Sequence, residues 1–209
     1  MVKIYHASPW YNYSNWIKGA VPVKKVEEAD LVLFCGGTDV YAGRYGQKSH
    51  KYAEDPDHPR DEEEIALFKR ATSLGIPMLG VCRGSQLLCV MNHGTLVQHQ
   101  ENPAYVHKVE TFDGLSIPIT STHHQAQYPF NLREGLDYKM LAYTKGMLRF
   151  HQGEDGVELN PPVEAEIVYY PNTRALAIQG HPESMDRDRY PQTFEWLDKQ
   201  IENLLNNTF

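Results

Sequence analysis

The chain has 209 residues, with 20 Lys and Arg against 27 Asp and Glu, which gives a formal net charge of −7. This acidic balance lacks the basic patch that contacts phosphate backbones, so no nucleic-acid partner is expected. The content of 41% hydrophobic and 11% aromatic residues excludes a disordered chain, and we expect one domain over residues 1–209. Apolar runs reach only about six residues, against roughly 20 for a bilayer span, and no signal core opens the chain. We therefore expect a cytoplasmic protein without a membrane partner.

The three cysteines are an odd number and form no C-x-x-C pair. They are Cys35, Cys82 and Cys89. This pattern fits neither a disulfide framework nor a thiolate zinc site. The question it raises is whether one of these thiols is a reagent.

The first half of the chain alternates strand-like and helix-like segments. Short apolar runs of strand length occupy 2–7, 30–35 and 78–82, helical spacing occupies 61–74 and 85–91, and a polar, aromatic segment at 9–18 also suits a helix. Uninterrupted apolar strands that helices connect are typical of a parallel sheet covered on both faces. The pattern predicts an α/β fold with a doubly wound, mostly parallel sheet, as in flavodoxin-like proteins.

The second half is richer in turns until its last fifty residues. Strand-like pieces occur at 107–111, 117–121 and 138–143, a hairpin is expected from 164–170 and 175–179, and a helix from 191–205. The segment 45–59, which is polar and carries two prolines, is predicted to be a surface loop.

The sharpest local motif is Gly80-Val-Cys82-Arg-Gly84, where a strand enters a helix through a tight turn. It has the pattern of a nucleophile elbow with Cys in place of Ser. A thiol at a helix amino terminus is more easily ionised, because the dipole and the free N–H groups favour the thiolate. Taken alone, the motif equally suits a buried small side chain, with glycines that let the helix approach the strand.

Two further loops follow predicted strands. In Gln179-Gly-His181-Pro-Glu183, the carboxylate could orient the imidazole of a general base, although a strand-end histidine beside a surface glutamate fits as well. Gly36-Gly37 exposes backbone N–H groups and lets a substrate carbonyl come close, as in an oxyanion hole, or simply ends a strand. All three motifs fall at strand ends, where doubly wound sheets place their sites.

Several motifs occur together in one order between residues 30 and 185. They are Gly36-Gly-Thr-Asp39-Val40 with Tyr45, Arg60-Asp61-x-x-Glu64, Cys82-Arg83-Gly84, Gly94-Thr-Leu-x-Gln98, His123-His124-Gln125 and His181-Pro-Glu183. With this set the chain resembles the class I glutamine amidotransferases, and most closely the branch named for gamma-glutamyl-gamma-aminobutyrate hydrolase.

The resemblance implies a function for each matching residue. Cys82 would attack a gamma-carboxamide to form a glutamyl thioester, His181 would shuttle the proton and Glu183 would hold His181. The backbone N–H groups of Gly37 and Arg83 would form the oxyanion hole. The residues implied to contact the small glutamyl substrate are Gly36, Gln86, Ser121, Thr122, His123 and His124.

The chain also departs from the family pattern, at His93-Gly94, at His99 and at Tyr41-Ala42. These positions surround the acceptor side, so the identity of the leaving amine is not fixed by the resemblance. The spacing of His93, His99, His107, His123 and His124 matches no ligand pattern, so no metal and no cofactor are expected.

Three functions remain open at this stage. The first is a free-standing thiol amidohydrolase that cleaves a gamma-glutamyl amide. The second is a glutaminase subunit that supplies ammonia to a separate synthetase, since this chain contains no P-loop. The third is a binding domain without activity on the same fold, against which the complete set of three motifs argues.

Overall fold

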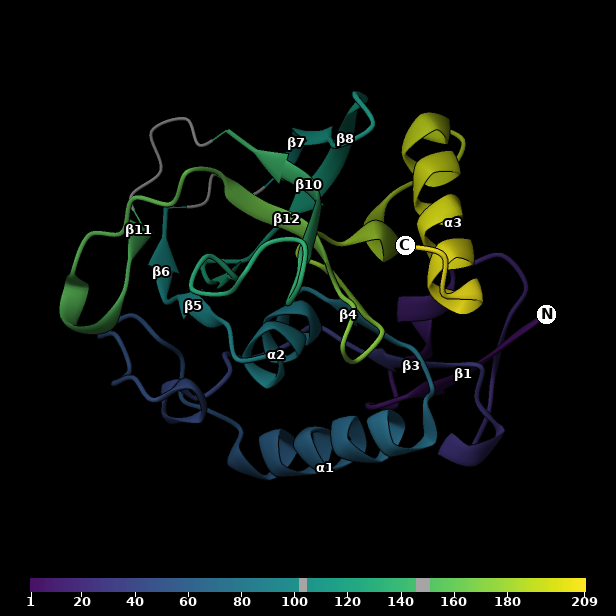
Figure 1. Cartoon of the computed structure of the whole chain (residues 1–209), viewed down its shortest axis with the longest axis horizontal. Coiled ribbons are helices and arrows are strands. Elements are labelled where there is room, and N and C mark those ends of the chain that lie inside the picture. Colours follow the sequence, from purple (N-terminus) through teal and green to yellow (C-terminus); the bar gives the residue numbers. More distant parts are fainter. Residues whose placement is uncertain (102–104, 146–150) are drawn as a thin grey trace.

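A computed structural model describes residues 1–101, 105–145 and 151–209 (Figure 1). The strands are β1 Val2–His6, β2 Ala20–Pro22, β3 Leu31–Phe34, β4 Met78–Val81, β5 Thr95–Val97, β6 His99–Gln100, β7 Tyr105–Thr111, β8 Ser116–Ser121, β9 Ala126–Tyr128, β10 Lys139–Thr144, β11 His151–Gln152, β12 Glu164–Tyr170 and β13 Ala175–Ile178. The helices are α1 His58–Leu74, α2 Arg83–Met91 and α3 Pro191–Asn206. Single 3-10 turns are η1 Tyr11–Ser14, η2 Val26–Glu28, η3 Ala42–Tyr45, η4 Glu154–Gly156 and η5 Pro182–Ser184.

The central sheet confirms the predicted doubly wound architecture. In the described residues its strand order is β2-β1-β3-β4-β13-β12-β10-β7-β8, and the strands from β2 to β13 are parallel. Beyond β13 the sheet continues with four antiparallel strands. The first of them, β12, forms the predicted hairpin with β13, whereas β10, β7 and β8 were not predicted as part of the same sheet. The carboxyl ends of β3, β4 and β13 therefore lie side by side, and all three candidate motifs follow them.

Both faces of the sheet are covered by helices. Along β3, Leu31 and Leu33 face the core that α3 closes, while Val32 and Phe34 face the core under α1 and α2. Figure 1 shows α1 and α2 on one side and α3 on the other. Strands buried on both faces read as continuous apolar runs, which explains the absence of alternation in their sequence.

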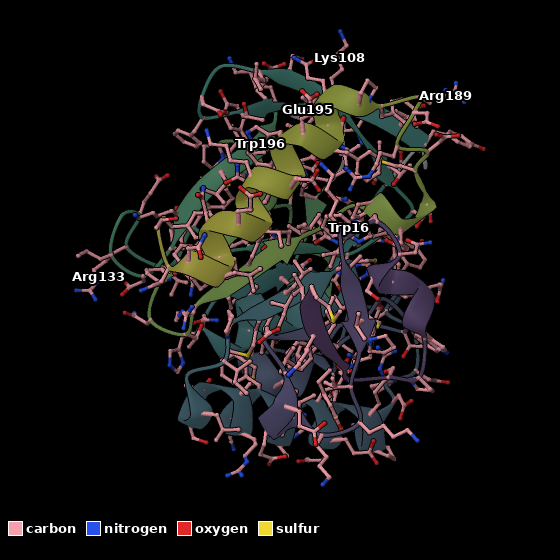
Figure 2. All side chains as sticks on the ribbon, turned by 90° about the vertical axis from the view of Figure 1, so that its right-hand side faces the viewer. Trp16, Lys108, Arg133, Arg189, Glu195 and Trp196 are labelled. Carbon is pink, nitrogen blue, oxygen red and sulfur yellow. The ribbon has the colours of Figure 1, made fainter. Side chains whose placement is uncertain are left out.

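Helix α3 packs with its aromatic stripe on the sheet. Trp196 is buried, and Phe194 lies 6.5 Å from the ring of Trp16, which arrives from the segment after β1. In Figure 2 this helix crosses the front of the molecule with Trp196 on it, while the charged Glu195 lies among the solvent-facing side chains. None of the helices among the described residues is long and apolar enough to cross a membrane.

Helix α2 approaches the sheet backbone to backbone. A Cβ on Gly84 would collide with the carbonyl of Phe34, and a Cβ on Gly80 would collide with the carbonyl of Gly84. The two glycines of the elbow motif thus allow a strand–helix distance that no other residue permits. Residues 83–90 are all buried.

One expectation is wrong. The segment 9–18 forms only the single 3-10 turn η1 in place of a helix, because its aromatic residues pack against the site and α3. The predicted surface loop 45–59 is irregular and mostly exposed up to the start of α1, with the exception of His50, which is 3% exposed and receives tertiary contacts.

Gly84→Ala should lower the free energy of unfolding by about 1–3 kcal/mol, because the added methyl group forces α2 away from β3. Urea unfolding measures this. Gly153→Ala is the control, since its Cβ would meet only the flexible side chain of Leu159 at 3.3 Å. Equal losses in the two variants would contradict the close packing described for α2.

Candidate functional site

Cys82 occupies the turn between β4 and α2 in a strained conformation. Its φ of +53° and ψ of −111° are unfavourable for a residue with a side chain. The turn is held by the Cys82 N–H, which donates to Ile178 O at 2.9 Å, and by Ser85, whose hydroxyl donates to Cys82 O at 2.6 Å. The thiol is therefore fixed at the amino terminus of α2.

His181 lies against Cys82 and is oriented by Glu183. Its Nδ1 is 2.6 Å from Glu183 Oε1, and its buried Nε2 has no nitrogen or oxygen partner among the described residues. Burial works to lower the pKa of His181, but the interactions with Cys82 and Glu183 outweigh it and raise the pKa to about 10. The imidazole therefore holds a proton between a thiol and a carboxylate.

The backbone of His181 is fixed by a residue that the sequence did not reveal. Thr120 on β8 accepts from the His181 N–H at 3.2 Å and donates its hydroxyl hydrogen to His181 O at 2.7 Å. Gly180 permits this contact, because a Cβ there would lie 2.5 Å from Thr120 O. No sequence signal marks Thr120, since its partner is 61 residues away.

The Gly36-Gly37 loop borders the same site. A Cβ on Gly36 would lie 3.4 Å from Cε1 of His181, which is van der Waals distance, and 2.5 Å from the hydroxyl of Tyr13, which is a clash. Gly37 has a φ of +143°, which favours glycine. The loop thus borders the histidine that the sequence places 145 residues later.

Tyr13 is a second site residue that sequence reasoning missed. Its ring centroid is 6.4 Å from that of His181. Burial, followed by the nearby charges of Glu183 and Cys82, raises the pKa of Tyr13 to about 12. Its hydroxyl therefore stays protonated beside the site. The aromatic composition of residues 10–16 was the only available signal, and it does not distinguish a site residue from a packing residue.

The backbone N–H and the side chain of Arg83 have different surroundings. As the first residue of α2, its N–H has no acceptor within the helix. Its guanidinium turns away into the core, where it is 1% exposed and pairs with Asp61 Oδ1 at 2.5 Å and with Glu64. The side chain anchors the position whose N–H was expected in the oxyanion hole.

Two groups of predicted substrate-binding residues are joined by a hydrogen bond and differ in how deeply they are buried. Gln86, one turn after Cys82, donates to Gln125 O at 2.9 Å. The ring of His123 is buried between the Ser121 hydroxyl at 3.0 Å and Gln125 O at 2.7 Å, whereas Thr122 is exposed. The structure therefore joins α2 to the segment 121–125, and the imidazole of His123 makes its hydrogen bonds within that segment.

His124 belongs to a cluster of rings next to this segment. Its Nε2 is 3.2 Å from Asp39 Oδ1, and a hydrogen bond with Asp39 raises the pKa of His124. His99 follows, with Nδ1 atoms 3.4 Å apart, and then Tyr52 and His50 at ring distances of 4.7 and 5.6 Å from His99. Burial, followed by the charges of His124 and His50, lowers the pKa of His99.

The other two thiols are inert by burial. Burial raises the pKa of Cys35 to about 12 and that of Cys89 to about 11. Both side chains belong to the apolar cores, as the sequence suggested.

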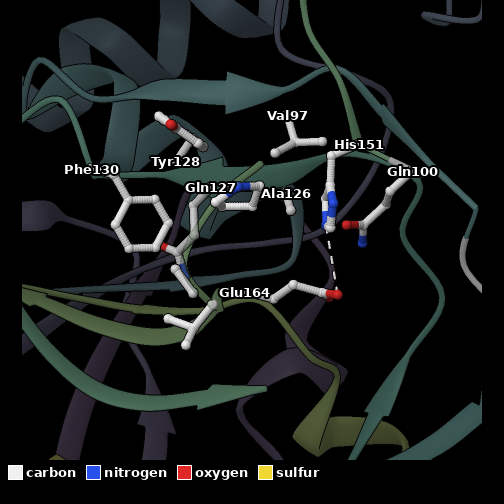
Figure 3. A pocket seen from close by; sticks show the side chains of 11 residues that line it. Val97, Gln100, Ala126, Gln127, Tyr128, Phe130, His151 and Glu164 are labelled. Atoms are coloured by element: carbon white, nitrogen blue, oxygen red, sulfur yellow. Dashed lines mark ion pairs between the residues drawn. The ribbon is translucent and has the colours of Figure 1, made fainter. Parts of the chain in front are cut away.

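A separate small cavity lies between β9, β11 and β12 (Figure 3). It has a volume of about 10 Å³ and is bordered by Gln100, His151 and Glu164. The His151 Nε2 and Glu164 Oε1 atoms are 3.6 Å apart. This space holds at most one water, so it is no substrate pocket. In the part of the chain that the structure describes, no three His, Cys, Asp or Glu residues are arranged to hold a metal ion.

Comparison with known families decides the membership of the chain. Residues 18–128 match the family model described as Peptidase C26. The chain belongs to the peptidase C26 family. Its relatives place it among the class I glutamine amidotransferase-like proteins.

Two relatives and one solved structure illustrate the similarity. A glutamine amidotransferase-like protein of Rickettsia prowazekii is 37% identical over 111 residues, which cover 44% of this chain and 38% of that protein. A YvdE homologue of Lactococcus lactis subsp. cremoris is 33% identical, covering 50% of this chain and 71% of its own. The Trypanosoma brucei CTPS glutaminase domain with bound acivicin has a TM-score of 0.59 at 12% identity, covering 100% and 95% of the two chains. The matched stretch thus spans less than half of the Rickettsia protein, and the solved structure shows the fold alone.

Glu183→Gln should lower the pKa of His181, because it removes a negative charge that stabilises the protonated ring. NMR titration of the imidazole measures this. A raised pKa adds stability that is present below the ordinary value of 6.5 and disappears as the pH rises through about 10. The wild type should therefore exceed Glu183→Gln in free energy of unfolding more at low than at high pH.

Glu195→Gln, on the exposed side of α3, is the control and should leave the His181 titration unchanged. An unshifted pKa in Glu183→Gln would show that Glu183 does not hold the charge of His181.

Proposed function

We propose that this chain is a thiol amidohydrolase that cleaves a gamma-glutamyl amide through a glutamyl thioester on Cys82. The observation that carries the proposal is the strained Cys82 at the start of α2 beside His181, whose other ring nitrogen is 2.6 Å from Glu183. This arrangement of nucleophile, base and orienting carboxylate is the one that acyl transfer requires.

In the first half-reaction the Cys82 sulfur attacks the gamma-carbonyl carbon. A carbon–sulfur bond forms, and the carbonyl electrons move to oxygen, where the N–H groups of Gly37 and Arg83 stabilise the charge. The tetrahedral intermediate then breaks its carbon–nitrogen bond. His181 gives its proton to the departing amine, since its raised pKa keeps the ring protonated at neutral pH.

In the second half-reaction water attacks the thioester. His181, now neutral, takes a proton from the water, and the carbon–sulfur bond breaks to release glutamate and the Cys82 thiolate. His181 ends the cycle protonated. Throughout the cycle Glu183 holds the Nδ1 atom of His181 and so keeps the Nε2 atom of His181 directed at the reacting atoms.

The substrate would be bound by α2 and by the segment 121–125 that is hydrogen-bonded to it. Gln86 and residues 121–124 would hold the glutamyl amino and carboxylate groups, and Gly36 leaves room for the carbonyl. The ring cluster of His124, His99 and Tyr52 would face the leaving amine. The assignments of Gly36, Gln86 and residues 121–124 follow the resemblance to the gamma-glutamyl-gamma-aminobutyrate hydrolase branch, whereas that of the ring cluster rests on the contact of His99 and Tyr52 with each other and of His99 with His124.

A glutaminase subunit that supplies ammonia to a separate synthetase is the second candidate. It is favoured by the fold shared with the glutaminase domain of Trypanosoma brucei CTPS. In that case glutamine is the amide substrate, and a partner protein is required for full activity.

Incubation with glutamine or with a panel of gamma-glutamyl-amines should yield a glutamyl adduct on Cys82 by mass spectrometry. Cys82→Ala should abolish both the adduct and amine release, while Cys89→Ala, which removes a buried thiol of the core, should retain them. Full hydrolysis by Cys82→Ala would contradict the mechanism.

The same panel separates the two candidates. Cleavage of gamma-glutamyl-amines by the protein alone supports the amidohydrolase. Release of ammonia from glutamine that occurs only when a partner protein is added supports the glutaminase subunit.

A further inference from the structure

The motif Arg60-Asp61-x-x-Glu64 has no function in the mechanism above, yet its side chains are buried next to the site. It occupies the first turns of α1, where Asp57 Oδ1 accepts from the Arg60 N–H at 3.1 Å. The side chains of Arg60 and Glu64 are 13% and 1% exposed. A charged pair buried this far needs a structural reason, because its desolvation is costly.

Arg60 is clamped onto the loop that follows β3. Its Nη2 donates to Cys35 O at 3.1 Å and to Gly36 O at 2.9 Å. Its Nη1 lies where a Cβ of Gly37 would be, so only glycine fits there. The ring of Trp10 covers the guanidinium at 5.0 Å. The guanidinium therefore fixes the backbone of Gly36 and Gly37 on one side.

This clamp determines where the Gly37 N–H points. Every peptide bond in the described residues is trans, and a trans peptide directs its carbonyl oxygen and its N–H to opposite sides. Because Arg60 holds the Gly36 oxygen, the N–H of Gly37 in the same peptide unit points away from Arg60. A Cβ built on Gly36 would lie 3.4 Å from Cε1 of His181, so this peptide unit borders the imidazole. The Gly37 N–H is thus turned away from the charged network of Arg60 and Glu64.

Glu64 extends the clamp to the second donor. Its Oε1 accepts from Arg60 Nε at 2.8 Å, and its Oε2 pairs with the guanidinium of Arg83. Arg83 supplies the other backbone N–H at the start of α2. One carboxylate therefore connects the side chain that orients Gly37 with the residue that carries the second donor.

We infer that Arg60 and Glu64 are positioning residues that set the direction and separation of the two oxyanion donors. This inference rests on the proposed function, since it concerns the charge that develops during acyl transfer. Arginine is required, because three donor contacts in one plane hold Glu64 and two carbonyls at once, whereas lysine offers a single charged point.

Two reactions of the same thiol test the inference. Iodoacetamide alkylates Cys82 by forming a carbon–sulfur bond as iodide leaves, with the thiol proton passing to buffer, so no oxyanion develops. Hydrolysis of a gamma-glutamyl amide requires the oxyanion donors. The variants are Arg60→Lys and Glu64→Gln, and Arg70→Lys on the exposed face of α1 is the matched control.

We expect kcat for amide hydrolysis to fall by about tenfold to a hundredfold in both variants, approaching the loss seen when one oxyanion donor is removed. KM and the iodoacetamide rate at Cys82, followed by mass spectrometry, should stay close to wild type. Arg70→Lys should change neither rate. If Glu64→Gln fails to fold, Arg60→Lys still tests the inference, because Arg60→Lys leaves the buried ion pairs of Arg83 with Asp61 and Glu64 in place.

Unchanged kcat in Arg60→Lys would overturn the inference. A parallel loss of alkylation and hydrolysis would also overturn it, since the motif would then act on the thiol or on folding in general. A wild-type protein that alkylates at Cys82 but hydrolyses no glutamyl amide and no glutamine would instead refute the proposed function, and the inference with it. Failure of the inference is therefore seen in the Arg60→Lys variant, and failure of the proposed function is seen in the wild-type protein.

Discussion

Backbone contact between α2 and β3 constrains the whole site. Because Gly84 packs directly on the Phe34 carbonyl, the chain must turn from β4 into α2 within a single residue, and that residue is Cys82. The strain at Cys82 is maintained by β4, whose residues are all buried, and by α2, which is buried over residues 83–90. A thiol held in this way loses little conformational entropy when it reacts.

The sheet brings the remaining groups to this turn. Parallel pairing of β4 with both β3 and β13 places three strand ends side by side, so a glycine loop, a nucleophile and a histidine from distant parts of the chain come together. The antiparallel extension then contributes Thr120, which fixes His181 from the far side. The site thus depends on both halves of the sheet.

Much of this could be predicted from the sequence, because local motifs and apolar runs carry their own signal. The strands before the site were visible as the apolar runs 30–35, 78–82 and 175–179, each with a glycine within the next two residues, and the elbow glycines marked the tight turn. The order of the antiparallel strands could not be predicted, since pairing between β10 and β12 depends on tertiary contacts that leave no local pattern. The same limit applies to Tyr13, whose position beside His181 results from packing alone.

Two of the three sulfur atoms are kept out of reaction by burial. Since the pKa of Cys35 is raised to about 12 and that of Cys89 to about 11, both remain neutral thiols at physiological pH. Cys35 immediately precedes the loop whose Gly36 borders His181, so a sulfur next to the site in sequence is kept neutral. A fluorescent or isotopic reporter that reacts with thiolate sulfur should therefore avoid Cys35 and Cys89 in the native chain.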